Sequence, residues 1–294
     1  MDRDAVDTVR SVNRLVTQRV GALDDAFLAR DRPLGAARVL WEIGADGVDG
    51  RELRTRLDLD SGYLSRLLRS LERDGLVAVA PGEADRRVRT ARLTPAGLAE
   101  RAELDRRSDD AAAALLDPLT EAQRARLVAA MTEVERLFVA STVEVAPVDP
   151  RDPAARRAAE AYYAVLGRRF PEGFDRGRSM PASDDDLTPP AGVLLLATLH
   201  AAPVGCGAVV FRADGTAHVK RMWVADGVRG TGLGRRLLAG LEAEAAARGI
   251  GVVRLETHAA LTEAIALYRS AGYREVERFN AERYAHHWFE KHLR

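Results

Sequence analysis

From residue 6 to residue 138, apolar residues recur mostly at intervals of three or four, the spacing of one face of an α-helix. An N-terminal stripe predicts one long amphipathic helix, and a later stripe predicts the last helices of this region. Long terminal helices that flank a compact middle expose apolar surface, which we expect a second copy of the chain to bury; a monomeric bundle is the alternative. The first stripe consists of Val6, Val9, Val12, Leu15, Val16, Val20, Leu23 and Phe27, and the later one of Leu115, Leu116, Leu119, Leu127, Met131, Val134, Leu137 and Phe138.

From residue 142 onward the pattern changes, because strands and helices alternate and prolines cluster. Val143, Val145 and Val148 indicate a first strand, and Pro147 and Pro150 prevent the preceding helix from continuing. We therefore expect an α+β chain of two domains, residues 1–140 and residues 141–294. In the second domain we predict a helix over 156–166, a loop over 171–190, and strands over 193–199, 204–211 and 217–224.

The middle of the first domain predicts two short helices joined by a turn, followed by a hairpin. The first helix covers 50–57, and the second begins at Ser61, with Asp60 or Ser61 as its cap. Strands over 76–79 and 88–94 enclose a polar tip and form a wing. Leu64, Leu67, Leu68 and Leu71 form the inner face of the second helix, leaving Ser61, Ser65, Arg66, Arg69 and Arg73 on its outer face.

These elements suit duplex DNA, because a helix fits the major groove and an arginine-tipped hairpin can enter the minor groove. Three features stand out: the order of these elements, Asp85-Arg86-Arg87 at the tip, and Leu93-Thr94-Pro95-Ala96-Gly97 before the next helix. In these features, roughly the first 140 residues resemble the MarR family of winged-helix regulators. The resemblance implies a mostly helical winged helix-turn-helix domain that dimerises and binds a double-stranded operator. A merely solvated basic face is the alternative. The implied DNA-binding residues are Ser61, Ser65, Arg66, Arg69, Arg86 and Arg87.

In the second domain a glycine-rich loop, Val228-Arg229-Gly230-Thr231-Gly232-Leu233-Gly234, follows a strand and opens a helix. This order is typical of phosphate binding, because backbone N–H groups converge on an anion at the positive end of the helix. A nucleotide-hydrolysing loop needs Lys and Ser or Thr after its last glycine, but here Arg235 follows. A dinucleotide fingerprint needs a glycine three residues after Gly232, where Arg235 stands. A mononucleotide for hydrolysis and a dinucleotide are therefore both disfavoured as ligands of this loop.

Arg229-x-x-Gly232-x-Gly234 matches the Arg/Gln-x-x-Gly-x-Gly/Ala signature of the GNAT acetyltransferases. The segments 220–224, 254–257 and 264–273 resemble their fourth strand, their fifth strand, and the helix and turn that follow. This resemblance covers residues 141 to 294 and implies a mixed α/β fold with a V-shaped central sheet and acetyl-CoA as co-substrate. The implied cofactor-binding residues are Met222, Trp223, Val224, Arg229, Gly230, Thr231, Gly232, Leu233, Gly234 and Arg235.

Acetyl transfer requires a base for the amine and an acid for the leaving thiolate. Tyr268 matches the tyrosine that often supplies that proton in GNAT enzymes, although it can equally anchor its helix. His218 stands where relatives often carry a glutamate base, and a packed histidine is the alternative. Glu256 and His258 are further candidates for the base. Leu261 departs from the asparagine of many relatives. The catalytic candidates are therefore Tyr268, His218 and Glu256.

The resemblance places two aromatic regions near the acceptor pocket, one around residues 162–174 and one around residues 280–288. Arginine among aromatic residues can hold a carboxylated small molecule, such as an amino acid, and the same residues can form an ordinary core edge. The substrate-binding candidates are Tyr163, Arg169 and Phe170.

The composition of the chain limits the kinds of site and partner that we expect. Forty-four basic and 44 acidic residues balance, so any DNA contact depends on a local basic patch. The single cysteine, Cys206, excludes an intrachain disulfide and a Cys-based zinc site; we expect it to be a buried small residue, and we expect no metal. No apolar run reaches the length of a membrane span and the N-terminus does not resemble a signal peptide, so we expect a cytoplasmic protein that does not contact a membrane.

Together these patterns predict a bifunctional protein. A MarR-like DNA-binding and dimerisation domain precedes an N-acetyltransferase that moves an acetyl group from acetyl-CoA to an amine, expected to belong to a small molecule. The alternative is a transcription factor whose second domain senses acetyl-CoA or an effector without turnover.

Overall fold

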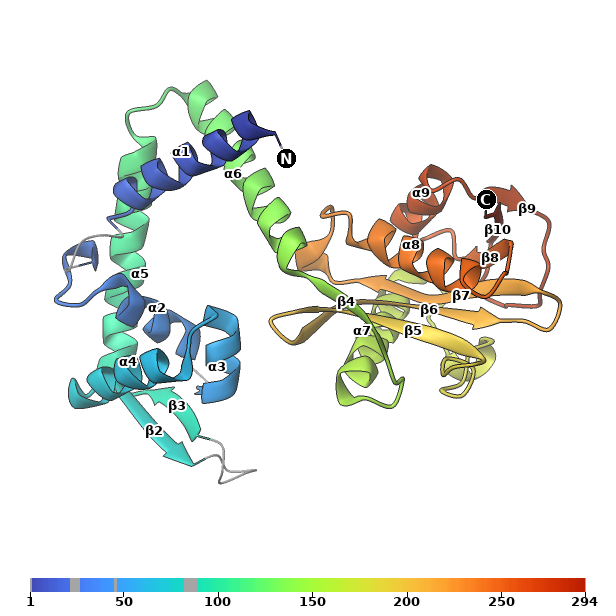
Figure 1. Cartoon of the computed structure of the whole chain (residues 1–294), viewed down its shortest axis with the longest axis horizontal. Coiled ribbons are helices and arrows are strands. Elements are labelled where there is room, and N and C mark those ends of the chain that lie inside the picture. Colours follow the sequence, from blue (N-terminus) through green and yellow to red (C-terminus); the bar gives the residue numbers. More distant parts are fainter. Residues whose placement is uncertain (1, 22–26, 45–46, 82–88, 294) are drawn as a thin grey trace. The chain divides into compact units, whose positions relative to one another are not determined.

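The computed structural model describes residues 2–21, 27–44, 47–81 and 89–293 (Figure 1). The chain forms two compact units, Met1–Ala129 and Ala130–Arg294, each with its own core. The division between them falls inside helix α6 (Glu121–Thr142), and the boundary that we predict after residue 140 falls near the end of the same helix. Within the described residues, no helix is long and apolar enough to cross a membrane.

The N-terminal unit contains the expected helix, turn, helix and hairpin. Asp60 caps the second of these helices by accepting a hydrogen bond from the N–H of Tyr63 at 2.9 Å. The strands form a small antiparallel sheet in the order β1-β3-β2. The elements of this unit are α1 (Arg3–Arg19), η1 (Phe27–Ala29), α2 (Leu34–Ile43), β1 (Val48–Asp49), α3 (Gly50–Leu57), α4 (Ser61–Arg73), β2 (Val77–Pro81), β3 (Arg89–Leu93) and α5 (Pro95–Leu116).

The first helix is shorter than its apolar stripe predicts. It ends at Arg19, and Gly21 follows with a φ of 65°, a left-handed conformation that terminates helices. Phe27, which we expected on this helix, lies in η1, is buried and contacts Trp41 edge to face. Leu23, another member of the stripe, lies outside the described residues.

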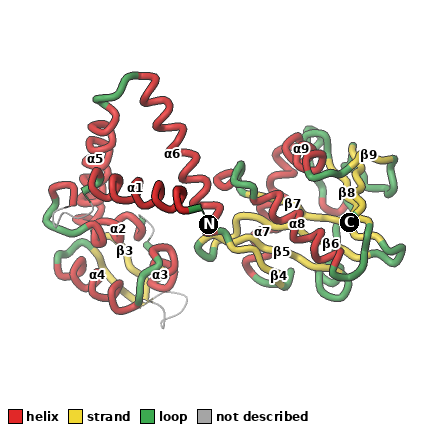
Figure 2. Tube along the Cα trace, turned by 45° about the horizontal axis from the view of Figure 1, so that its top comes forward, coloured by secondary structure: helices red, strands yellow, loops and turns green. Residues whose placement is uncertain are grey.

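The C-terminal unit is a seven-stranded mixed sheet with helices on both faces (Figures 1 and 2). Helix α7 packs on one face through Ala155 and Ala158, and α8 covers the other through Leu237 and Leu241. After α6, its elements are β4 (Glu144–Val148), α7 (Pro153–Arg169), η2 (Arg176–Arg178), β5 (Gly192–Leu199), β6 (Ala202–Phe211), β7 (Thr216–Val224), η3 (Asp226–Val228), α8 (Leu233–Ala246), β8 (Val252–Thr257), α9 (Thr262–Ser270), β9 (Arg274–Val276) and β10 (His287–His292).

The sheet order is β4-β5-β6-β7-β8-β10-β9, and β7 and β8 are its parallel pair. These two strands pair only from Thr216 to His218 on β7, opposite 252–254 on β8. Beyond that point β8 pairs with β10 alone, whereas β7 continues along β6. The sheet therefore opens between β7 and β8, as the predicted V shape requires.

A bulge in β7 lies beside this opening. The register between β6 and β7 shifts between Cys206 and Ala208, and Arg221 has a φ of 54°. A Cβ at Gly207 would lie 2.7 Å from Sδ of Met222, so a side chain opposite the bulge would require Met222 to shift. Cys206 is buried as expected, and burial raises the pKa of its thiol to about 12, which makes it a packing residue.

Gly192 provides a test of how tightly this sheet is packed. A Cβ at Gly192 would lie 2.1 Å from the carbonyl oxygen of Asp186 and 2.5 Å from that of Val209, and backbone atoms cannot easily yield. We expect Gly192→Ala to lower the free energy of unfolding by about 2 kcal/mol. The matched variant Gly167→Ala, in α7 with open space around its Cβ, is expected to raise it by ~0.5–1 kcal/mol.

Urea unfolding in a Trp41→Phe background measures both changes, because the remaining tryptophans, Trp223 and Trp288, belong to the C-terminal unit. Equal midpoints for the two glycine variants would contradict this account of the packing.

Candidate active site

The glycine-rich loop has the geometry of an anion-binding helix start. Gly230 and Gly232 have φ values of 79° and 83°, a region that residues with side chains rarely adopt. Helix α8 begins at Leu233, and its N-cap residue Gly232 provides no side-chain cap. The N–H groups of the first turn are therefore available to a phosphate.

This loop forms one wall of a groove of about 380 Å³ between α8, α9 and the end of α7. Arg235 reaches the Ser270 hydroxyl at 2.7 Å, and Arg229 pairs with Asp226 at 2.7 Å, so both predicted cations are held at the loop. Thr231 does not line the groove; its hydroxyl donates to the carbonyl of Val228 and braces the loop. The other nine predicted cofactor-binding residues line it: Met222, Trp223, Val224, Arg229, Gly230, Gly232, Leu233, Gly234 and Arg235.

Gly234 sets how closely the two helices of the groove approach each other. A Cβ at this position would lie 3.2 Å from Cδ2 of Leu267 on α9, tighter than ordinary contact. The third glycine of the motif thus serves helix packing, whereas the first two serve the conformation of the loop.

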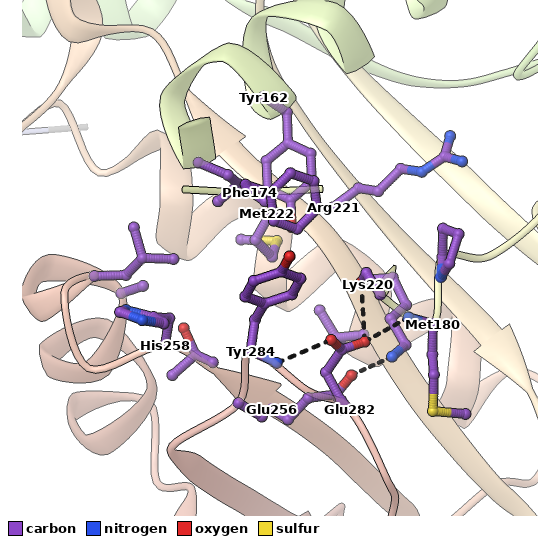
Figure 3. A pocket seen from close by; sticks show the side chains of 18 of the residues that line it. Tyr162, Phe174, Met180, Lys220, Arg221, Met222, Glu256, His258, Glu282 and Tyr284 are labelled. Atoms are coloured by element: carbon purple, nitrogen blue, oxygen red, sulfur yellow. Dashed lines mark hydrogen bonds and ion pairs between the residues drawn. The ribbon is translucent and has the colours of Figure 1, made fainter. Parts of the chain in front are cut away.

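A smaller pocket of about 110 Å³ adjoins the groove (Figure 3). Tyr268, Met222 and Leu261 line both, so the two spaces meet at these side chains. The pocket walls are mainly aromatic, and its polar groups come from β7, β8 and the loops before β5 and β10. Its aromatic lining consists of Tyr162, Tyr163, Phe170, Phe174, Tyr268 and Tyr284, and its charged lining of Lys220, Arg221, Glu256 and Glu282.

Glu256 lies on β8, past the last residue that pairs with β7. Its carboxylate is paired with the ammonium of Lys220 on β7, and it also accepts a hydrogen bond from Nδ2 of Asn280 at 3.1 Å. Its side chain is 6% exposed. An ion pair therefore bridges the opening of the sheet and places a carboxylate in the pocket.

Tyr268 is buried on α9 at the junction of pocket and groove. Burial, and secondarily the nearby charge of Glu256, raise the pKa of its phenol above the ordinary value. The phenol thus keeps its proton at neutral pH. Tyr268 and Glu256, two of the three predicted catalytic residues, are brought together here.

His218 is not brought to this site, although its sequence position suggested a base. It lies on β7 opposite Arg254, where β8 still pairs, and its ring contacts Phe279 at 5.4 Å. Its Nε2 is buried and has no hydrogen-bond partner among the described residues. Burial, reinforced by Arg212 and Lys220, lowers its pKa to about 4. The structure therefore shows a packed neutral histidine that lines neither pocket nor groove.

His258 lines the pocket, but both of its ring nitrogens have partners. Nδ1 accepts a hydrogen bond from the N–H of Ala260 at 2.9 Å, so Nε2 carries the proton and donates to Glu172 at 3.1 Å. Its ring stacks on Phe170 at 3.9 Å. His258 thus ties the end of α7 to the loop after β8.

The predicted substrate residues divide between the two spaces. Tyr163 and Phe170 line the pocket, whereas Arg169 lines only the groove. Arg169 donates to the carbonyl of Ala260 and pairs with Glu263 at 2.8 Å, which holds it on the cofactor side. Our expectation that Arg169 contacts the acceptor is therefore not supported.

Three charged pocket residues, Lys220, Arg221 and Glu282, did not emerge from the sequence as site residues. Glu282 is 8% exposed and accepts hydrogen bonds from the Ser179 hydroxyl and the Met180 N–H, which fixes the loop before β5. Figure 3 shows Lys220 directed toward the carboxylates, whereas Arg221 leaves the same strand in another direction. For Lys220 and Arg221, the signal that could have identified them is a charged residue on a strand that is otherwise mostly buried.

In the N-terminal unit, α4 presents the expected polar face. Leu64, Leu67 and Leu71 are buried, and Ser61, Ser65, Arg66 and Arg69 are exposed. Arg86 and Arg87, the predicted wing residues, lie outside the described residues.

The low pKa of His218 predicts a contribution to acid sensitivity. Because the folded pKa, about 4, lies below the ordinary value of 6.5, the unfolded chain binds a proton first as the pH falls. Stability from this group is complete above pH 6.5 and is lost between about pH 6.5 and 4. We expect His218→Gln to reduce the difference between urea midpoints at pH 7 and pH 5. An unchanged difference would mean that His218 is not buried in its neutral form.

Comparison with known proteins finds one family match in each unit. Residues 156–273 match the Acetyltransferase (GNAT) family, and residues 31–88 match the MarR family. An IAA acetyltransferase of Azospirillum brasilense is 42% identical over 80 residues, which make up 27% of this chain and 52% of that protein. The chain thus spans about half the length of this curated relative.

Two of the solved structures that match cover about half of this chain. An acetyltransferase of the GNAT family from Staphylococcus aureus MU50 is 18% identical, has a TM-score of 0.46, and the match covers 52% of this chain and 99% of that one. A GNAT family acetyltransferase from Elizabethkingia anophelis with acetyl-CoA bound is 16% identical, with a TM-score of 0.37 and coverage of 52% and 99%. From the two family matches, the chain joins a MarR family domain to an acetyltransferase domain of the GNAT family.

Proposed function

We propose that the C-terminal unit transfers an acetyl group from acetyl-CoA to the amine of a small molecule. The observation that carries this proposal is the junction at Tyr268, where a groove with a phosphate-binding helix start meets a pocket containing a buried carboxylate. The pocket encloses about 110 Å³, which suits a small acceptor rather than a protein segment. The 42% identity to an IAA acetyltransferase over 80 residues is consistent with this class of reaction.

The groove residues fit coenzyme A. The uncapped start of α8 and the open loop glycines receive the pyrophosphate, with Arg229 and Arg235 beside it. The backbone of Met222 and Val224 lies along the groove, where β7 runs free of β8, and can hydrogen-bond the pantetheine arm. When bound, acetyl-CoA would supply an activated acyl group, and the backbone of β7 at the bulge of Arg221 and Met222 would hold its carbonyl.

The pocket residues provide the proton transfers. Glu256, paired with Lys220, accepts the proton that the attacking amine loses, directly or through one water. Tyr268 retains its proton at neutral pH and donates it to the departing sulfur. His218 has no part in this scheme, because it lies outside the pocket.

Replacing the proposed acid tests the proposal. We expect Tyr268→Phe to lower kcat for CoA release by about 100-fold, because general acid catalysis contributes on this scale. Binding of acetyl-CoA, measured by calorimetry, should not change. The matched control is Tyr273→Phe, a buried tyrosine whose ring centroid lies 6.0 Å from that of Tyr268 and which lines neither space. Equal losses in the two variants would contradict an acid role for Tyr268.

The same assay separates the enzyme from the sensing alternative. Wild-type protein that binds acetyl-CoA but releases no CoA with a broad panel of amines would favour a regulator that only senses its ligand. The intact tyrosine at the junction favours turnover.

For the N-terminal unit, we propose that it binds a double-stranded operator as a homodimer. The exposed serine and arginine face of α4 supports DNA contact. Support for dimerisation comes from the apolar residues of α1 and of α6, because neither helix has a buried residue in this single chain. Leu15 on α1 and Leu127 on α6 are 55% and 37% exposed, which is unfavourable unless another chain covers them.

Operator binding should depend on Arg66. We expect two chains per operator, and we expect Arg66→Ala to reduce the slope of log affinity against log salt concentration by about 1, as one lost phosphate contact would. Arg274→Ala, an exposed arginine on β9, is the control and should leave the slope unchanged. Fluorescence anisotropy with promoter DNA measures both, and identical slopes for all three proteins would exclude α4 from the interface.

A further inference from the structure

One buried cation of the pocket has an unused hydrogen-bond donor. Arg221 is 7% exposed and lines the pocket. Its Nη2 donates to the carbonyl of Ala182 at 2.7 Å, but its Nε has no partner among the described residues. A buried N–H of a charged group without an acceptor is unfavourable, and a ligand that supplies an acceptor would relieve this cost.

The carboxylates of the pocket, in contrast, already have hydrogen-bond partners. Both oxygens of Glu256 accept hydrogen bonds, from Lys220 and Asn280, and both oxygens of Glu282 accept hydrogen bonds from protein donors. Arg221 forms no ion pair with a described carboxylate, and Figure 3 shows it leaving β7 away from Glu256 and Glu282. The pocket therefore has an unmatched positive group at one end and satisfied carboxylates at the other.

The space between these ends has aromatic walls. Tyr163 and Phe174 stack at 5.8 Å, and Phe174 lies 5.0 Å from Tyr284. The guanidinium carbon of Arg221 lies 6.0 Å from the ring centroid of Tyr163, so the cation and the aromatic wall are adjacent. A planar apolar group fits such walls, and a charged end group would meet Arg221.

We propose that the acceptor is a small aromatic amino acid, bound with its carboxylate on Arg221 and its amine facing Glu256 and Tyr268. This inference rests on the proposed acetyl transfer. The amine nitrogen forms the bond to the acetyl carbon and the carbon–sulfur bond breaks. The proton lost by the amine goes to Glu256, and the sulfur receives one from Tyr268. The products are an N-acetyl amino acid and CoA.

Three related amines test the role of the carboxylate in the full-length protein. L-Phenylalanine has the carboxylate, L-phenylalaninamide has a neutral amide in its place, and 2-phenylethylamine lacks the group. We expect the KM of wild type for L-phenylalanine to be at least about tenfold lower than for the other two, because charge-assisted hydrogen bonds are the stronger ones. Equal KM values for the three amines would overturn the proposal.

Replacement of the cation identifies where the carboxylate binds. Arg221→Met should raise the KM for L-phenylalanine at least about tenfold more than it raises the KM for the amide, and Arg221→Lys should restore part of the difference between the two substrates. Arg176→Met is the control, because Arg176 lies 4.6 Å from the ring of Tyr163 but is exposed and does not line the pocket. Equal losses with acid and amide would show that Arg221 acts only by holding the loop at Ala182.

These experiments distinguish failure of the proposed acetyl transfer from failure of the amino-acid assignment. If no amine is acetylated, the proposed transfer is wrong, and calorimetry of L-phenylalanine and its amide with acetyl-CoA present still compares their binding. Tighter binding of the acid that is lost in Arg221→Met supports the pocket assignment, and equal binding or none refutes it. Turnover of other amines without turnover of L-phenylalanine refutes the inference and leaves the transferase intact.

Discussion

The parallel pairing of β7 and β8 stops after three residue pairs, and the candidate active site depends on that interruption. Parallel strands that stayed paired would satisfy each other's backbone groups and close the sheet. Because they separate after His218, backbone groups of β7 near Met222 and Val224 lie along a groove and can receive a ligand. The start of α8 and the buried phenol of Tyr268 then converge on the same opening.

The opening is stabilised by side chains rather than by the backbone. Lys220 and Glu256 form an ion pair across it, and Asn280 holds the second carboxylate oxygen. Partly buried charges are costly to desolvate, so the stability that this ion pair adds does not by itself explain its presence. The pair is better explained by where it holds the carboxylate of Glu256. The bulge at Arg221 has a second consequence, because the adjacent residues Lys220 and Arg221 both line the pocket. A regular strand would place them on opposite faces of the sheet.

Local features of the chain were predictable, and features that depend on distant strands were not. The helix-turn-helix pattern, the capping by Asp60 and the order of strand, glycine loop and helix are all encoded within short stretches, and the structure has them as expected. His218 was misplaced because the sequence does not show where pairing with β8 ends; two residues further on, Lys220 lies in the pocket. Arg169 was misplaced because its partners, Ala260 and Glu263, lie about ninety residues away.

The composition of the chain has one feature, its scarcity of lysine, that the structure places in context. The chain has 44 basic residues, of which only Lys220 and Lys291 are lysines. Both are partly buried, with side chains 13% and 24% exposed, and both pair with a glutamate. A guanidinium is broad and planar, whereas an ammonium is a compact charge that fits a narrow space beside one carboxylate. Both lysines thus form partly buried ion pairs, and one of these pairs lies across the opening between β7 and β8.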